Sequence, residues 1–468
     1  MNNTNIIAAI VLGSSRITGI VGNKEIDGSV RVKGHVSLPS SDFIGKGRVL
    51  NIEKMTTCLS NIKAHLEEEA SCRFKCFYVA IDCQGLRSMS NEVSIQLPQS
   101  EIVSDDMLAS ISVRNKEANP ADREILEAIA LEYIVGTKST LEPKGMPSDR
   151  LVARFLNVTC NTNVISTIRT CFRKAGIELA GGRLCVAAEQ LASVVTSEQE
   201  RTSGCAFVDM GSETTTVAIY KNKLLRHLVT IPLGGANITR DIMNVFNVEQ
   251  DEAENFKCTY GYPDIEEIGE KEEIHLRDGG RVKKLADLAD IIDARVEEIV
   301  QNIKHQVELS GYTNDTLVNG LYVCGGGAQM KNIQSAFSSH FKDWNVRIIK
   351  NVTRPVAVCS DKKFTESGIF NTGLAIIDNA DINCYGGDYQ GLFNTEPSPE
   401  EVEAKRQEEE AAAKKAEEDA AAAKKAEEEA AAEAAAEAAK KKGPSKLSKF
   451  FKNVMKKAAN LVSEDNEY

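Results

Sequence analysis

Apolar residues along the chain fall into short continuous runs that alternate with stretches of helical spacing. The short runs predict strands at Ile6–Leu12, Cys76–Asp82, Val152–Cys160, Cys205–Met210 and Gly320–Cys324. Apolar positions recur every three to four residues over Ile52–Ala70 and Leu285–Ser310, which indicates amphipathic helices. This alternation over residues 1–384 predicts an α/β architecture whose sheets are covered by helices.

The pattern changes after residue 384. Residues 385–399 are rich in Gly, Asn, Pro and Ser and lack periodicity, which predicts a linker. Residues 400–442 repeat Ala, Glu and Lys, and Val402 is their only apolar residue larger than alanine. We therefore expect a solvated helical spacer within a linker region of 385–444. A coiled coil is disfavoured because no repeated Leu, Ile or Val fills a heptad seam.

Residues 445–463 predict a short amphipathic helix. The lysines on or beside the polar face include Lys449, Lys452 and Lys456. The apolar face comprises Leu447, Phe450, Phe451, Val454, Met455, Ala458, Leu461 and Val462. A lysine-rich helix with two adjacent phenylalanines is typical of segments that lie in the interface of an anionic membrane. A groove on a partner protein is the alternative docking place.

Composition narrows the class of protein. A chain of 468 residues predicts two or more folding units, and a net charge of −12 argues against a general nucleic-acid binder. Its twelve cysteines are scattered without a CxxC pair, so we expect reduced thiols in a cytosolic protein and no metal site built from protein ligands alone. The apolar run Ile6–Leu12 is too short for a signal peptide and lacks a preceding basic region. No segment approaches the ~20 apolar residues of a membrane-spanning helix.

Three glycine-containing turns are the candidate chemistry. Two of them lie roughly 200 residues apart, each between two apolar strands, and a third follows a later strand. Glycine lets backbone N–H groups approach phosphate oxygens closely, and a run of glycines permits packing against a flat ligand. Each turn alone is a common hairpin feature, but the three in this order indicate a nucleotide site. The turns comprise Gly13, Ser14, Ser15 and Arg16; Asp209, Gly211, Ser212 and Thr214; and Gly325, Gly326 and Gly327.

This order of turns resembles the superfamily of actin, sugar kinases and heat-shock chaperones, in which two related α/β domains close on ATP and Mg²⁺. The resemblance implies that the first two turns hold phosphates and that the third lies against the adenosine. Residues 253–257 resemble a helix whose Glu254 and Lys257 reach the ribose and base, and residues 189–193 resemble a helix that places a polar residue near the γ-phosphate. Asp209 and Glu189 are therefore the candidate catalytic residues.

Within that superfamily the chain is most similar to the FtsA family of cell-division proteins. Residues 225–242, with Gly234 and Gly235, resemble the second connecting region of that family and add two cofactor-binding candidates. Residues 84–162 stand where FtsA proteins carry an extra subdomain. The implied first actin-like domain comprises 1–83 and 163–202. The second comprises 203–384, with an adenosine-side subdomain at about 237–311.

The resemblance implies a function. An FtsA-type protein would bind ATP, form actin-like filaments and tether the tail of FtsZ to the cytoplasmic face of the cell membrane at the division site, where later divisome proteins join. The tail would contact the helix around Leu288–Arg295, with Arg295 a candidate partner for its acids. An MreB-like or pilus-assembly scaffold is an alternative, and a small-molecule kinase is a weaker one. A chaperone-like ATPase is disfavoured because residues 400–442 cannot form a β-rich peptide-binding domain.

One position departs from the superfamily pattern. Relatives usually carry an acid two residues before the first glycine, where this chain has Val11. Valine cannot orient a hydrated Mg²⁺, so we expect ATP–Mg²⁺ binding with weak or absent hydrolysis. Glu213 is a candidate substitute for the missing acid.

Overall fold

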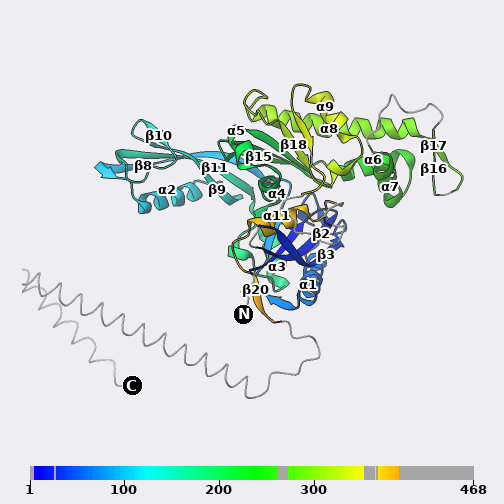
Figure 1. Ribbon diagram of the computed structural model, residues 1–468, viewed down its shortest axis with the longest axis horizontal. Helices are drawn as coiled ribbons and strands as arrows, with labels where there is room; N and C mark the ends of the chain where they lie inside the picture. Colours follow the sequence, from blue (N-terminus) through cyan, green and yellow to red (C-terminus); the bar gives the residue numbers. More distant parts are fainter. Residues whose placement is uncertain are drawn as a thin grey trace, which may run out of the picture. The chain divides into compact units, whose positions relative to one another are not determined.

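The structure is a computed structural model that describes residues 5–25, 28–261, 272–277, 279–352, 364 and 367–388, all of them in one compact unit (Figure 1). Its first sheet has the order β12-β7-β1-β2-β3. Strands β3, β2 and β1 are antiparallel neighbours, and β7 and β12 continue the sheet in parallel. The strands are β1 (Ile6–Leu12), β2 (Arg16–Lys24), β3 (Val30–Pro39), β7 (Tyr78–Ile81) and β12 (Cys185–Val186).

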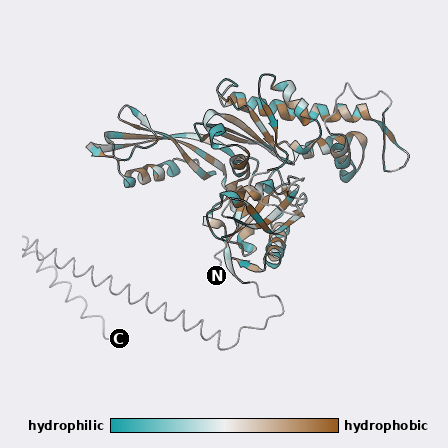
Figure 2. Cartoon of the chain, in the orientation of Figure 1, coloured by the Kyte–Doolittle hydropathy of each residue, from teal (hydrophilic) through white to brown (hydrophobic). Residues whose placement is uncertain are grey.

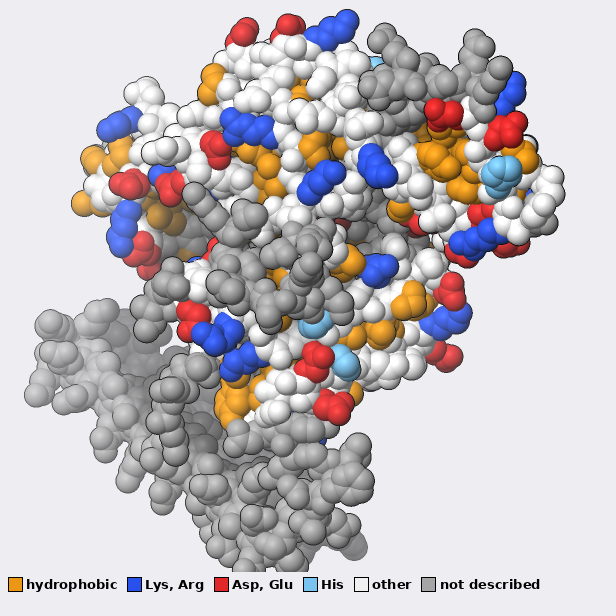
Figure 3. Space-filling model, turned by 45° about the vertical axis from the view of Figure 1, so that its right-hand side comes forward, with side chains coloured by type: hydrophobic (Ala, Val, Ile, Leu, Met, Phe, Trp, Pro, Cys, Tyr) orange, Lys and Arg blue, Asp and Glu red, His pale blue; other side chains and the backbone are white. Residues whose placement is uncertain are grey.

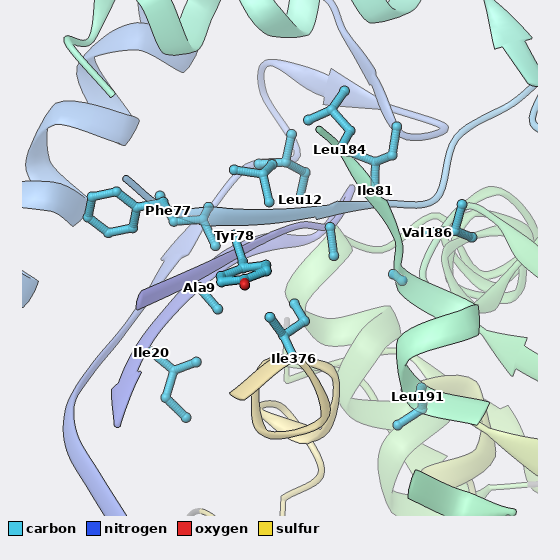
Figure 4. Close-up of a cluster of buried hydrophobic side chains, with 14 of the residues drawn as sticks. Ala9, Leu12, Ile20, Phe77, Tyr78, Ile81, Leu184, Val186, Leu191 and Ile376 are labelled. Atoms are coloured by element: carbon cyan, nitrogen blue, oxygen red, sulfur yellow. The ribbon is translucent and has the colours of Figure 1, made fainter. Parts of the chain in front are cut away.

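Helices cover both faces of this sheet. Helix α1 packs on β2 and β3, and α11 packs on β1 and β2 and against α4. Figure 4 shows the result: Ile20 and Ile376 lie on one side of the sheet and Leu184 on the other, around the strands that carry Ala9 and Tyr78. This continuous apolar core fixes the strand ends that carry the first hairpin turn. The helices are α1 (Ile52–Glu69), α3 (Thr162–Lys174), η1 (Ala180–Gly182), α4 (Ala187–Val195) and α11 (Asn371–Asn379).

The second domain repeats the same strand arrangement. Strands β15, β14 and β13 are antiparallel neighbours, and β18 and β19 continue in parallel. Helix α8 packs on β14 and β15 and contacts α6 and α9. The elements are α5 (Glu198–Ser203), β13 (Cys205–Met210), β14 (Thr215–Lys221), β15 (Leu224–Ile231), α6 (Gly235–Phe246), α7 (Gln250–Tyr260), β16 (Glu273–His275), β17 (Val282–Lys284), α8 (Leu285–Leu309), β18 (Leu321–Cys324), η2 (Gly327–Gln329), α9 (Ile333–His340) and β19 (Val346–Ile348).

An inserted domain stands in the sequence between the two halves of the first domain, and Figure 1 shows it extending outward from β15. Its long strands β8 and β11 pair antiparallel, β9 and β10 follow on the β11 side, and α2 covers one face. It has a small core of its own, with Ile111 and Leu151 fully buried, and Figure 2 shows hydrophobic positions along its strands. The pairing of Arg87 with Val229 joins it to β15 of the second sheet. The elements are β8 (Arg87–Ile102), α2 (Asp105–Glu117), β9 (Arg123–Val135), β10 (Lys138–Thr140) and β11 (Pro147–Asn161).

Two short antiparallel pairs complete the described elements, and one of them corrects a prediction. Strand β4 (Ile44–Gly45) pairs with β5 (Arg48–Val49), and β6 (Cys72–Phe74) pairs with β20 (Tyr385–Asp388). The predicted linker began at residue 385, but the chain is still part of the fold there. The amide of Cys384 donates to the carbonyl of Ile6 at 2.7 Å, which brings the following residues to the free edge of β6.

The five predicted strands and both long helices are confirmed, with ends shifted by at most a few residues except at β11, which begins five residues earlier. No helix among the described residues is long and apolar enough to span a membrane. On the face drawn in Figure 3, acidic and basic side chains are interspersed. The charged spacer and the amphipathic helix of 445–463 lie outside the described residues.

Candidate functional site

The first two predicted turns have the same geometry. In the β1–β2 hairpin, the amide of Gly13 donates to the carbonyl of Arg16 at 3.2 Å; in the β13–β14 hairpin, the amide of Gly211 donates to the carbonyl of Thr214 at 2.8 Å. A Cβ at Gly13 would lie 2.6 Å from the Arg16 carbonyl oxygen, and one at Gly211 would lie 2.8 Å from that of Thr214. Both turns therefore close only because glycine leads them.

A third segment, the β4–β5 turn, holds the two hairpins together. The amide of Gly47 donates to the hydroxyl of Ser14 at 2.9 Å, and the amide of Lys46 donates to Glu213 Oε2 at 2.7 Å. Glu213 also pairs with the guanidinium of Arg240 at 2.9 Å. Because Glu213 is held by these two donors, it serves as an anchor for the turn and is a poor candidate to replace the acid missing at Val11.

Two polar residues of the first turn face the neighbouring strand and its loop. The amide of Ser40 donates to the carbonyl of Ser15 at 3.0 Å, and the guanidinium of Arg16 donates to Ser37 on β3 at 3.3 Å. The hydroxyl of Ser40 donates to the carbonyl of Gly13 at 2.7 Å. Ser37 and Ser40 therefore fix the first turn through one side chain and two carbonyls.

The second turn lies against the amino end of α6. The amide of Gly235 donates to the carbonyl of Gly211 at 3.0 Å, and the amide of Ala236 donates to that of Ser212 at 2.7 Å. A Cβ at Gly234 would lie 2.6 Å from both of those carbonyl oxygens, so only glycine fits there. The predicted residues of this connecting region are thus brought next to the second hairpin.

The predicted pair on α7 reaches the same place. The ammonium of Lys257 donates to the carbonyl of Gly235 at 3.2 Å, to the hydroxyl of Thr239 at 2.9 Å and to Glu254 Oε2 at 2.6 Å. The hydroxyl of Thr239 donates to the same Glu254 oxygen at 2.5 Å. Glu254 and Lys257 therefore form one hydrogen-bonded group beside the second hairpin.

The third glycine run packs against that hairpin from the other side. Gly325 has φ +94, and a Cβ there would overlap Asp209 Oδ1. A Cβ at Gly327 would lie 2.9 Å from the Cβ of Met210, whereas a Cβ at Gly326 would meet no protein atom within 4 Å. The sequence predicted that these glycines permit close approach. For Gly325 and Gly327 the approaching group is the second hairpin, and open space lies beside Gly326.

An acid that the sequence reading missed lies at the centre of the site. Asp82 directly follows β7, and burial together with the charge of Asp209 raises its pKa well above its usual range, against hydrogen bonds from the Ala188 amide and the Thr216 side chain. Its Oδ1 atom is buried and has no hydrogen-bond partner among the described residues. Burial also raises the pKa of Asp209 to about 6. In the sequence, the only sign that Asp82 belongs to the site is its position directly after the apolar run Tyr78–Ile81.

Asp82 stands close to the position that Val11 leaves without a charge. Strand β1 pairs in parallel with β7 in the register Val11–Ala80, so Asp82 lies two residues beyond the partner of Val11. The corresponding pair in the second domain is Asp209 with Cys324. Each domain therefore contributes one carboxylate. In the second domain it is Asp209 on β13, the first strand of the hairpin. In the first domain it is Asp82, which directly follows β7, the parallel neighbour of β1.

Comparisons with known proteins agree with this geometry. The model of the family "Cell division protein FtsA" matches residues 206–369, and that of the "SHS2 domain inserted in FTSA" matches residues 83–159. The model of the type IV pilus assembly protein PilM matches residues 125–269. FtsA of Pseudomonas aeruginosa is 28% identical over 332 residues, which are 69% of this chain and 78% of that protein. FtsA of Porphyromonas gingivalis is 29% identical over 381 residues, 79% of this chain and 76% of that protein.

The chain belongs to the FtsA family of cell-division proteins. Its fold is actin-like with an inserted SHS2 domain, as the sequence predicted. Among solved structures, the PilM–PilN type IV pilus biogenesis complex has a TM-score of 0.57 at 15% identity, covering 79% of this chain and 97% of that one. MreB5 of Spiroplasma citri bound to AMPPNP has a TM-score of 0.45 at 12% identity, covering 81% and 95%.

Two further candidate residues of this FtsA-family chain lie on helices α4 and α8. Glu189 is on α4. Burial is the main cause that raises the pKa of Glu189 well above its usual range, and a hydrogen bond with Glu127 of the inserted domain adds to it. Arg295 is on α8, where its guanidinium pairs with Asp241 of α6 and with Glu298. The residues of this chain that are predicted to contact the membrane lie outside the described residues.

Proposed function

We propose that this chain is an FtsA-type adaptor that binds ATP with Mg²⁺ between its two hairpins, forms actin-like filaments and tethers FtsZ polymers to the cytoplasmic membrane during septum formation. One observation supports the binding of nucleotide: three glycine-led turns lie close together with the amino end of α6 and the Glu254–Lys257 group. Backbone amides in such turns and at a helix amino end favour anions such as phosphates.

The residues present fit a nucleotide-bound Mg²⁺. Among the described residues no cluster of three or more His, Cys, Asp or Glu side chains could hold a metal ion alone. Mg²⁺ in nucleotide sites is usually held by one or two carboxylates, with water and phosphate oxygens completing the octahedron. Asp82 and Asp209 supply two carboxylates, and the unpartnered Asp82 Oδ1 is suited to a water ligand of the ion. When bound, the ion neutralises charge on the phosphates.

Binding of nucleotide is tested by a side chain placed in the open space beside Gly326. Because a Cβ there meets no protein atom within 4 Å, Gly326→Val should leave the fold intact while obstructing a ligand packed on the turn. Gly280→Val is the matched control, since a Cβ at Gly280 also meets nothing and lies in the β16–β17 turn. Calorimetric titration with ATP and Mg²⁺ should show affinity at least about tenfold weaker for Gly326→Val alone. Equal affinity of both variants would contradict adenosine packing on this turn.

Slow turnover follows from Val11. Nucleotide acts as a conformational or polymerisation switch in this proposed function, and the protein is not an efficient ATPase. Phosphate release assays should therefore show turnover far below about 1 s⁻¹, the lower range of kinases. Steady release above that rate by the purified wild-type protein, absent in Asp209→Asn, would overturn this part of the proposal while leaving nucleotide binding in place.

Binding of the FtsZ tail is supported by a groove between α6 and α8. The groove has a volume of about 320 Å³ and combines an exposed Val245, 59% accessible, with the guanidinium of Arg295. Asp241 holds that guanidinium, with Nη2–Oδ1 at 3.0 Å, so an acidic peptide must share or displace this partner. The groove is lined by Asp241, Asn244, Val245, Ile291, Ala294, Arg295 and Glu298.

The test uses a pair of opposite substitutions. Arg295→Glu should abolish binding of an FtsZ tail peptide, and Asp241→Asn should strengthen it because the guanidinium loses its internal competitor. Arg277→Glu is the matched charge reversal, since Arg277 pairs with Asp251 on α7 in the same domain. Fluorescence anisotropy with a labelled tail peptide measures all three. Unchanged affinity in Arg295→Glu would remove this residue from the binding site.

Membrane attachment is tested on the full chain. The predicted interfacial helix should bind anionic liposomes weakly alone and more strongly when a filament presents several copies. Co-sedimentation of the full chain and of a chain ending at Lys442, with and without ATP, separates these effects. Loss of binding on truncation and a gain with ATP are expected. Failure of the full chain to bind in either state would assign the helix to a protein partner.

A further inference from the structure

The β4–β5 turn is fixed to the first domain through both of its central residues. The carbonyl of Lys46 accepts from the amide of Gln84 at 2.9 Å, and the amide of Gly47 donates to the hydroxyl of Ser14 at 2.9 Å. Gln84 lies in the loop that follows β7, and Ser14 lies in the first glycine turn. These contacts hold the β4–β5 turn from the side of the first domain.

The second domain holds the same turn through a carboxylate. The amide of Lys46 donates to Glu213 Oε2 at 2.7 Å, and the guanidinium of Arg240 on α6 donates to Glu213 Oε1 at 2.9 Å. The side chain of Glu213 is only 22% exposed, so water screens these charge-assisted bonds incompletely. We call the group formed by Glu213, the Lys46 amide and Arg240 the Glu213 latch.

The backbone of the turn is shaped to offer that amide. Lys46 has φ +51 and Gly47 has φ +72, and a two-residue hairpin of type I′ requires positive φ at both positions. A residue with a side chain rarely adopts this conformation. Here the peptide groups of Lys46 are held by Glu213 on one side and by Gln84 on the other. The contacts with both domains therefore keep a strained residue where its amide reaches Glu213.

The Glu213 latch joins the two glycine turns that the proposed function assigns to phosphate. Glu213 directly follows Ser212 of the second turn, and Gly47, next to Lys46, binds Ser14 of the first. The β4–β5 turn stays with the first domain, whereas Glu213 and Arg240 stay with the second. A movement that separates the two glycine turns must therefore break the hydrogen bond between Lys46 and Glu213.

We propose that the Glu213 latch holds the two domains together over bound nucleotide and thereby sets the rate at which nucleotide leaves. This inference rests on the nucleotide binding proposed above and concerns the regulation of that same site. Glu213 is a positioning residue, because it acts through the β4–β5 turn and not on the ligand. Opening of a closed site often limits release of its ligand. Slow release suits a nucleotide switch, because the bound state then persists between changes of nucleotide.

The experiment measures release of radiolabelled ATP with Mg²⁺ from the full chain after a chase with excess unlabelled ATP. Glu213→Ala should release ATP at least about tenfold faster than wild type, a change of about 1.4 kcal/mol in the barrier. Glu213→Gln keeps an oxygen for the Lys46 amide but loses the charge, so its rate should lie between the two. Glu198→Ala is the matched control and should match wild type, because the Glu198–Lys223 ion pair is exposed and joins α5 to the β14–β15 turn.

Hydrogen exchange without added nucleotide provides a readout that is independent of the ligand. In Glu213→Ala the amide of Lys46 loses its acceptor and should exchange faster, whereas the amide of Gly47 keeps Ser14 and should be unchanged. Faster exchange at both amides would show that the turn has unfolded, and unchanged exchange at Lys46 would show that no latch was broken. Either result would overturn the inference.

The release rates separate this inference from the proposed function. Wild type that binds ATP, together with a Glu213→Ala variant that releases it at the wild-type rate, would overturn the latch and leave the nucleotide site intact. Wild type that binds no ATP would overturn the proposed nucleotide binding and the latch with it. Faster release from Glu213→Ala, with an intermediate rate for Glu213→Gln and an unchanged rate for Glu198→Ala, would support both.

Discussion

The buried carboxylate of Asp209 should make the nucleotide-free protein less stable at neutral pH than an otherwise identical protein without that charge. Burial raises the pKa of Asp209 from 3.8 to about 6. The folded protein therefore keeps a proton over a pH range in which the unfolded chain has already lost it. Stability is lost as the pH rises from the unfolded pKa through the folded one, the opposite direction to that of a salt-bridged carboxylate.

The magnitude follows from the shift. Each pKa unit corresponds to 1.36 kcal/mol, so ionised Asp209 costs about 3 kcal/mol above about pH 7. Asp82 acts in the same direction, because its pKa is also raised by burial and by the charge of Asp209. Burial and the charge of Asp209 raise the pKa of the Cys324 thiol well above its usual range, so this thiol keeps its proton near neutral pH. Asp209→Asn removes the ionisation and keeps a similar shape. We expect it to raise the free energy of unfolding by about 3 kcal/mol above about pH 7, with the gain shrinking as the pH falls from 6 toward 4.

Urea denaturation across that pH range measures the effect without nucleotide. Asp343→Asn is the control, since Asp343 is exposed and should give a pH-independent difference near zero. ATP with Mg²⁺ should then stabilise wild type more than Asp209→Asn, because the cation compensates a charge that only wild type carries. An Asp209→Asn protein that is equally or less stable than wild type above about pH 7 would refute this reasoning.

Three further predictions concern other residues of the candidate site. Gly47→Ala should destabilise the protein by about 1–3 kcal/mol or more in urea denaturation, because φ is +72 and the new Cβ would overlap the carbonyl oxygen of Asp82; an unchanged midpoint would contradict the turn geometry. Lys257→Met should weaken ATP binding at least about tenfold in calorimetry, and equal affinity would remove Lys257 from the ligand site. Val11→Asp should speed phosphate release at least about tenfold if the missing acid limits turnover, with Val11→Asn as the control that adds no charge.

Local patterns in the sequence were sufficient for the hairpins and helices. The runs around Gly13 and Gly211 predicted strand–turn–strand units because apolar strands flank each glycine, and both units are present. Strand β20 was missed because Tyr385–Asp388 carries two glycines and no apolar alternation. It becomes a strand through the free edge of β6, which is more than 300 residues away along the chain.

The chemistry of the site depends on contacts that no local pattern contains. Asp82 follows an ordinary buried strand, and its importance comes from the parallel pairing of β1 with β7 and from the charge of Asp209. Glu213 looked like a free acid in the sequence, yet the β4–β5 turn engages it through the amide of Lys46. The contacts of Asp82 and Glu213 form only when the two domains come together. The periodicity of a short segment cannot predict such contacts.

The two-domain repeat shows how the first domain supplies an acid near the Val11 position although β1 carries none there. The order β12-β7-β1-β2-β3 of the first sheet recurs as β19-β18-β13-β14-β15 within the nine-stranded second sheet, so the ends of β1 and β7 correspond to those of β13 and β18. The second domain keeps its carboxylate on the hairpin strand at Asp209, whereas the first has Val11 there and an acid just past β7. Two carboxylates that repel each other in a buried place lower stability unless a cation joins them. Under the proposed function, ATP with Mg²⁺ offsets this cost, so we expect the free energy of unfolding to increase when nucleotide and cation are added.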